Sequence, residues 1–146
     1  MENTNNEELN WEEYEKITGY IYEVLGGKYG VKVKGYGKSC WVSGKSGVRH
    51  QIDVLTEHFH GGESILTAIE CKFVKKKITK DAVMKLHSIM NDSEIAKGII
   101  VCKTGFTKDT LIYAEHLGIK LVELREVENS ANNIINLGIL EINSQI

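Results

Sequence analysis

Two apolar runs interrupted by charged residues constrain this chain more than any other feature. The first run holds Asp53, and the second holds Glu70 and Lys72 two positions apart. Side chains alternate between the faces of a strand, so Glu70 and Lys72 are expected on one face and Cys71 on the other. If the runs are neighbouring strands, Asp53 joins the pair. Two carboxylates and an amine among apolar strands are unfavourable unless compensated, so the pattern indicates a chemical role.

The hydrophobic periodicity around these runs predicts an α/β protein. The expected order is helix, three strands, helix, strand, helix, strand, which gives a mixed sheet between helices. Two adjacent glycines, Gly61 and Gly62, predict a hairpin between the second and third strands. A glycine- and serine-rich stretch over residues 37–47 predicts a loop. The predicted helices cover residues 11–25, 79–91 and 106–117, and the predicted strands cover 29–36, 49–58, 64–73, 98–102 and 119–124.

The length of 146 residues suggests one domain with one core. We expect a flexible tail over 1–10, a main domain over 11–125, and an apolar extension over 126–146 that packs on the core or on a dimer partner. No run approaches the roughly 18 apolar residues of a membrane span. The polar, acidic start is not a signal peptide, and three widely spaced cysteines fit a reducing compartment. We therefore expect a cytoplasmic protein without membrane contact.

Positive charge is concentrated in the middle of the chain. Residues 28–85 hold twelve Lys and Arg against five Asp and Glu, a net charge of +7, whereas the rest of the chain carries −9. A basic middle between acidic ends suits a polyanion bound on one side of the molecule. The alternative is a lysine-rich surface that is merely solvated.

The three charged residues are suited to metal-assisted chemistry. Asp53 and Glu70 are hard oxygen ligands that fit an octahedral ion such as Mg²⁺, and the ion would remove their mutual repulsion. Lys72 beside the ion can orient or deprotonate a water, or hold a phosphate oxygen. Together these residues predict a phosphodiester hydrolase. The alternative is a structural salt bridge between Glu70 and Lys72, with Asp53 exposed.

Several residues near the two runs are candidates for contacts with nucleic acid. Three lysines directly follow the run that holds Lys72, where they can meet phosphates near the scissile bond. Gln51 shares the face of Asp53 if the strand period holds, whereas His50 is expected to pack on the other side. Two basic residues flank the glycine-rich loop, which can close over DNA. The candidate contacts are Gln51, Arg49, Lys45, Lys75, Lys76 and Lys77.

Residues 47–55, 69–72 and 103–107, together with the first predicted helix, carry a family resemblance. In this combination the chain resembles the PD-(D/E)xK nuclease superfamily, in its Mrr-like restriction endonuclease branch, over roughly residues 11–124. The resemblance implies a restriction-endonuclease-like mixed β-sheet flanked by helices, with an αβββαβ core. It also implies that the main domain is a nuclease catalytic domain, a Mg²⁺-dependent DNA endonuclease in which Mn²⁺ can substitute.

The resemblance further implies a role for each site residue. Asp53 and Glu70 would be the metal ligands, and the backbone carbonyl of Cys71 would be a further ligand. Lys72 would be the catalytic lysine. Glu15, in the first predicted helix, would be the acid that approaches the metal or its waters.

Two departures from the family pattern bear on these expectations. Ile52 stands where the motif is named for proline, but in the family the acid is the residue that binds the metal, so this departure is expected to matter little. Many relatives carry a separate recognition domain, for which this chain has no room, so we expect specificity to be low, structural (junctions, flaps or modified DNA), or supplied by a separate partner. One site per chain and two DNA strands favour a homodimer. The alternatives are a catalytically silent nuclease-fold binding module and a nuclease specific for RNA, junctions or flaps.

Overall fold

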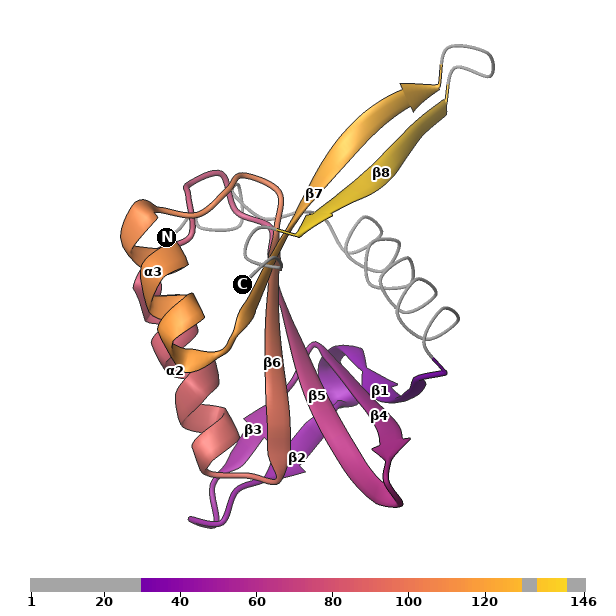
Figure 1. The fold of residues 1–146 in the computed structure, drawn as a ribbon, viewed down its shortest axis with the longest axis vertical. Helices are drawn as coiled ribbons and strands as arrows, with labels where there is room; N and C mark the ends of the chain where they lie inside the picture. Colours follow the sequence, from indigo (N-terminus) through magenta and orange to yellow (C-terminus); the bar gives the residue numbers. More distant parts are fainter. Residues whose placement is uncertain (1–29, 130–133, 142–146) are drawn as a thin grey trace.

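The computed structural model describes residues 30–129 and 134–141. Six strands form one sheet in the order β1-β4-β5-β6-β7-β8, and β2 pairs with β3 in a separate two-stranded sheet (Figure 1). The elements are β1 (Lys32–Tyr36), the 3-10 turn η2 (Gly37–Ser39), β2 (Trp41–Ser43), β3 (Arg49–Gln51), β4 (Val54–His60), β5 (Glu63–Lys72), α2 (Lys80–Asn91), β6 (Ile95–Cys102), α3 (Lys108–Leu117), β7 (Lys120–Asn129) and β8 (Ile134–Glu141). The expected tail over 1–10 and first helix over 11–25 lie outside the described residues.

The six-stranded sheet is mixed, as the sequence predicts. β1, β4 and β5 are antiparallel, β5, β6 and β7 are parallel, and β8 is antiparallel to β7. α2 connects β5 to β6 and α3 connects β6 to β7, and both helices lie on the same side of the sheet in Figure 1. No helix within the described ranges is long and apolar enough to cross a bilayer.

The hairpin of β4 and β5 brings together the two runs that define the candidate site. Gly61 and Gly62 form its two-residue turn with φ of 61° and 85°, the left-handed values that a type I′ turn requires at both positions. In the resulting antiparallel register Val54 lies opposite Ile69. Asp53, one residue before Val54, is therefore placed beside Glu70, one residue after Ile69.

The expected strand over 49–58 is wrong as a single element. β3 ends at Gln51 and β4 begins at Val54, so the chain bends at Ile52 and Asp53. The break has a tertiary cause: Ile52 is fully buried, and its N–H donates to the carbonyl of Cys40 at 2.9 Å instead of to a neighbour in the main sheet. The expected loop over 37–47 is also more ordered than predicted, because it contains η2 and β2.

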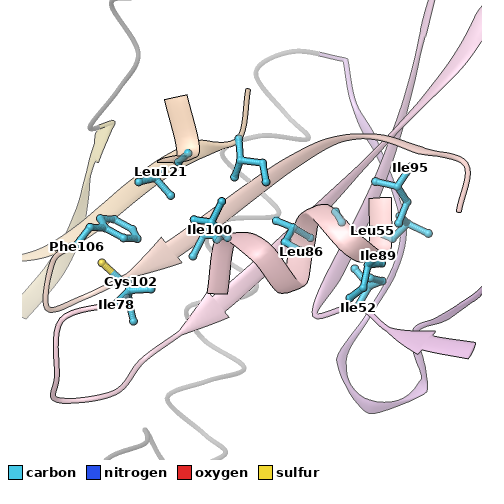
Figure 2. Packing of buried hydrophobic residues seen from close by; sticks show 14 of the residues in the cluster. Ile52, Leu55, Ile78, Leu86, Ile89, Ile95, Ile100, Cys102, Phe106 and Leu121 are labelled. Atoms are coloured by element: carbon cyan, nitrogen blue, oxygen red, sulfur yellow. The ribbon is translucent and has the colours of Figure 1, made fainter. Parts of the chain in front are cut away.

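A hydrophobic core fills the space between the two helices and the sheet. Figure 2 shows Leu86 of α2 facing Ile100 of β6. A second cluster, on the opposite face of the sheet, includes Ile69 and Val101. Leu86, Ile100 and Ile69 are 0–1% exposed. Burial on this scale stabilises the fold by roughly 1.5–3 kcal/mol for each large aliphatic side chain.

The ends of α2 and α3 lie within two residues of their predicted bounds. Thr107 caps α3 through its side chain, which accepts from Thr110 N–H at 3.3 Å, and Gly118 ends the helix with φ of 74°. Thr79 occupies the N-cap position of α2, but its side chain makes no capping hydrogen bond. Beyond residue 125 the chain continues β7, and β8 adds a strand to the edge of the sheet.

Candidate active site

Asp53 lies at the bend before β4 and is fixed by the neighbouring strand. Its Oδ2 accepts a hydrogen bond of 2.8 Å from the backbone N–H of Cys71, and its own carbonyl accepts from Gly37 N–H at 2.9 Å. Cys71 separates Glu70 from Lys72 in β5, so the Asp53 carboxylate is held against the backbone between the two other predicted site residues.

Glu70 is the least satisfied member of the site. Its Oε2 is buried and has no hydrogen-bond partner. Burial disfavours the charged form and raises the pKa of Glu70 to about 8; the negative charge of Asp53 and a hydrogen bond with that carboxyl raise it further, whereas Lys72 and Lys85 act in the opposite direction. Two close carboxylates in a poorly solvated position therefore retain a proton near neutral pH.

Lys72 lies on the same face of β5 as Glu70, as the alternation predicts. Ala68 packs in the core under α2 and α3, whereas Ile69 and Cys71 belong to the cluster on the opposite face. The two-residue period then places Glu70 and Lys72 on the helix side. Lys72 is half-buried. The structure thus brings Asp53, Glu70 and Lys72 together at the carboxyl end of β5.

Two further residues near the carboxylates have no clear sequence signal. Lys85 is exposed on α2 and close enough to Glu70 to lower its pKa, so a second lysine faces the site from the helix. Cys40 is buried nearby. Burial raises the pKa of the Cys40 thiol, and the charges of Asp53 and Glu70 raise it further. Such a thiol stays protonated and is a poor metal ligand.

The donor set fits a divalent cation. A buried oxygen without a partner beside a second carboxylate is an arrangement that a cation relieves, and hard oxygen donors suit Mg²⁺. No group of three or more His, Cys, Asp and Glu side chains placed to hold a metal ion occurs in the described part of the chain. Side chains there would supply two ligands, and backbone or water oxygens the others, as is usual for Mg²⁺. Glu15 lies outside the described residues.

The three lysines after β5 are exposed on a loop that is hydrogen-bonded to the loop between β6 and α3. The carbonyl of Lys76 accepts from Thr104 Oγ1 at 2.9 Å, and Ile78 N–H donates to the carbonyl of Gly105 at 2.9 Å. Lys75, Lys76 and Lys77 therefore project from an anchored segment that begins three residues after Lys72.

The remaining predicted contact residues lie in the small β2–β3 hairpin, Arg49 and Gln51 in β3 and Lys45 in the turn between the two strands. Arg49, Gln51 and Lys45 are exposed. The prediction that Gln51 shares the face of Asp53 is wrong, because β3 ends at Gln51 and the strand period does not continue to Asp53. Gln51 instead donates to the carbonyl of Gly37 at 3.5 Å.

The alternation predicts a packing role for His50, but its side chain also makes a hydrogen bond. Its Nε2 donates to Asp92 Oδ2 at 2.8 Å, which links β3 to the C-terminal end of α2. Sequence reasoning missed Asp92 because it is 42 residues away from His50. It also missed Trp41, an exposed aromatic residue inside the predicted loop.

The comparisons with known proteins place this geometry in a family. A family model for restriction endonucleases, Mrr_cat, matches residues 6–130, so the chain belongs to this restriction endonuclease family, as the sequence motifs predict. The crystal structure of a protein of unknown function, AF1548, is similar with a TM-score of 0.57 and 26% identity, covering 74% of this chain. The chain spans 56% of that protein's length. No curated protein matches.

Proposed function

We propose that the protein is a divalent-metal-dependent endonuclease that hydrolyses phosphodiester bonds in DNA. The observation that carries the proposal is the buried, unpartnered Oε2 of Glu70, beside Asp53 and Lys72 at the carboxyl end of β5. Membership of a restriction endonuclease family supports the same activity. A structural salt bridge alone accounts for the site less well, because Glu70 then keeps one oxygen without a partner.

In this proposal each residue of the site has a separate task. Asp53 and Glu70 hold the ion, here Mg²⁺ or Mn²⁺, together with the backbone carbonyl of Cys71. Glu15 approaches the same ion or its waters. Lys72 orients the attacking water or neutralises a phosphate oxygen, as a mobile point charge can. When bound, the ion supplies Lewis-acid stabilisation of the phosphate and a lower pKa for a bound water.

The backbone of Cys71 has a positioning task in this proposal. Its N–H holds Asp53 Oδ2 at 2.8 Å, which leaves the other oxygen of that carboxylate to face Glu70 or the ion. Glu70 must lose its proton before it binds a cation, because its pKa is raised to about 8. The site is therefore expected to gain metal affinity with rising pH.

DNA would lie across the carboxyl end of β5 and the small sheet. Lys75, Lys76 and Lys77 are exposed beside the site, where they can neutralise phosphates next to the scissile bond. Arg49 and Gln51 of β3, with Lys45 in the turn before that strand, extend the contact surface. Target selection would come from DNA structure or from a separate specificity partner.

We also propose a homodimer, because one site per chain cuts two strands most simply with twofold symmetry. The β7–β8 ribbon, which extends away from the rest of the sheet in Figure 1, is the proposed contact between the two copies. Sedimentation of the full chain tests this point: a dimer is expected, and a chain that stays monomeric on cleavable DNA as well as alone would contradict it.

Plasmid cleavage tests the activity. Supercoiled plasmid is incubated with Mg²⁺ or Mn²⁺ and with wild-type protein, Asp53→Asn, Glu70→Gln or the control Glu63→Gln. Glu63 is exposed at the opposite end of the same strand, so its substitution matches that of Glu70 without touching the site. We expect nicking by the wild type and the control, and none by the site variants. Equal nicking by all four proteins would contradict the proposal.

A catalytically silent binding module is the alternative outcome. It would show as metal binding that depends on Asp53 and Glu70, without hydrolysis of plasmid, flap, junction or RNA substrates. Cleavage of only the RNA or of only the branched DNA would retain the chemistry and change the substrate.

A further inference from the structure

The small β2–β3 sheet presents one exposed face that the metal site does not use. Its register pairs Trp41 with Gln51 and Ser43 with Arg49, so these four side chains share a face. All four are exposed. The opposite face is the inner one, where Val42 packs against the core and His50 binds Asp92; we call the exposed side the outer hairpin face.

Trp41 and Arg49 form a cation–π pair on the outer hairpin face. The guanidinium carbon of Arg49 lies 4.9 Å from the centroid of the Trp41 ring, and the indole N–H donates to the carbonyl of Lys38 at 2.9 Å. Trp41 nevertheless remains 45% exposed. Tryptophan is usually well buried, so an exposed indole ring in a fixed orientation indicates a surface suited to a planar ligand.

The β2–β3 sheet is rigidly attached to α2. Asp92, which follows α2, accepts hydrogen bonds from Ser46 N–H (2.8 Å), Ser46 Oγ (2.7 Å) and His50 Nε2 (2.8 Å). A Cβ at Gly44 would overlap Asp92 Oδ2, so the hairpin approaches the helix end as closely as the backbone permits. A surface held in this way is organised before its ligand arrives, which lowers the entropy lost on binding.

The outer hairpin face also has a fixed relation to the carboxylate site. Cys40, next to Trp41, accepts the hydrogen bond of 2.9 Å from Ile52 N–H, and Ile52 precedes Asp53. Gly37 N–H donates to the carbonyl of Asp53 itself at 2.9 Å. The backbone that carries the aromatic pair is thus hydrogen-bonded to the backbone that carries the first metal-binding acid.

These features select a particular ligand chemistry. Indole and guanidinium planes stack on nucleobases, and Lys38, Lys45 and Arg49 supply positive charge for the strand that carries the base. Bases inside a continuous duplex are already stacked on one another and offer no free face to a side chain. A stacking surface of this kind is suited to unpaired bases and not to paired ones.

We propose that the outer hairpin face stacks an unpaired base of DNA onto the Trp41–Arg49 pair, beside Asp53 and Glu70. This inference rests on the proposed nuclease function for its choice of ligand, and it narrows the substrate class to DNA with unpaired nucleotides, such as flaps, gaps and junctions. Phosphates next to the stacked base then enter the site, and continuous duplex is held by charge alone.

Binding without divalent ions separates this inference from catalysis. Three DNAs are compared in EDTA: a duplex, the same duplex with a single-stranded flap, and the same flap built from abasic nucleotides, which keep the phosphates and lack the bases. We expect the normal flap to bind about 10-fold more tightly than the other two, because stacking is the interaction that only bases provide. Equal affinity for normal and abasic flaps overturns the inference without any protein variant.

Protein variants then assign the effect to Trp41. Trp41→Ala should remove the preference for the normal flap, and Trp41→Phe should retain most of it. Phe59→Ala is the matched control, because Phe59 is an exposed aromatic residue (69%) near the end of β4 remote from Asp53. A Trp41→Ala protein with an unchanged preference overturns the inference, provided that circular dichroism shows wild-type folding.

Fluorescence gives a direct readout on the ring. The chain has two tryptophans, so Trp11→Phe leaves Trp41 as the only tryptophan emitter. Its emission should be quenched by the normal flap and far less by the abasic flap, and equal quenching by both contradicts stacking. If no DNA is cleaved but flap binding depends on Trp41, the nuclease proposal fails and this inference stands. Plasmid cleavage that depends on Asp53, with base-independent binding, supports the nuclease proposal and overturns this inference.

Discussion

Asp53 Oδ2 accepts a hydrogen bond of 2.8 Å from the backbone N–H of Cys71, the residue between Glu70 and Lys72. This bond fixes one carboxylate of the site against the strand that carries the other. Asp53 and Glu70 stay close despite their repulsion for two reasons. The Asp53 carboxylate has a fixed donor, and the Glu70 carboxyl has a pKa raised to about 8, so it can stay protonated near neutral pH.

Metal affinity should depend on pH because a proton and a cation compete for Glu70. The pKa of Glu70 is about 8, so below that pH each bound cation must displace a proton. We expect the affinity for Mn²⁺ to rise about 10-fold per pH unit from pH 6 to 8 and to level off above it. Calorimetry in buffers of different ionisation enthalpy measures both affinity and proton release. Affinity independent of pH would contradict the competition.

Removing the charge of Glu70 should stabilise the metal-free protein at high pH. A carboxyl whose pKa is raised on folding contributes full stability below its unfolded value near 4.5, and that contribution is lost as pH rises through about 8. Glu70→Gln cannot ionise, so at pH 9 in EDTA it should exceed the wild type by on the order of 1–4 kcal/mol in the free energy of unfolding. Urea unfolding measures the difference. Glu63→Gln is the control. If the free energy of unfolding depends on pH in the same way in the wild type and in Glu70→Gln, ionisation of Glu70 does not affect stability.

Asp92 should stabilise the attachment of the β2–β3 sheet above acidic pH. Its pKa is lowered to about 2, first by the hydrogen bond with His50 and then by those with Ser46. For a lowered pKa the stabilisation is present above the unfolded value of 3.8 and is lost as pH falls through about 2. Asp92→Asn should therefore lower the melting temperature at pH 6, and its difference from the wild type should shrink between pH 4 and 2.

Thermal melts monitored by circular dichroism check this expectation, with Asp109→Asn as a control. Asp109 is an exposed acid in the first turn of α3 and takes no part in the attachment. A deficit of Asp92→Asn that stays constant down to pH 2 would show that the substitution acts through packing instead of charge.

Two glycines in the same loop should respond differently to alanine. At Gly44 a Cβ would overlap Asp92 Oδ2 and lie 2.7 Å from the carbonyl of Val48, whereas at Gly47 it meets nothing within 4 Å. Gly47 has φ of 95°, so alanine there should cost only the backbone strain of about 1–2 kcal/mol. Gly44→Ala should lower the free energy of unfolding by more, because the hairpin must move away from α2. Urea unfolding of both variants decides the order, and a larger loss at Gly47 would be the opposite of this expectation.

Several features of the fold were predictable because they depend on local chemistry. The Gly61–Gly62 turn fixes the β4–β5 hairpin, the period of two puts Glu70 and Lys72 on one face, and Gly118 ends α3. Each of these signals lies within a few residues of the structure that it produces. The metal-binding roles, the contribution of Glu15 and the dimer remain predictions.

The sequence by itself determined the family, the mixed sheet and the pair of runs that carry Asp53, Glu70 and Lys72. Only the tertiary structure decided the break at Ile52, the attachment of His50 to Asp92 and the exposed position of Trp41. The physical reason is distance along the chain: the Cys40 carbonyl that redirects Ile52 is 12 residues away, and Asp92 is 42 residues from His50. Local periodicity cannot register partners that meet only after the chain has folded.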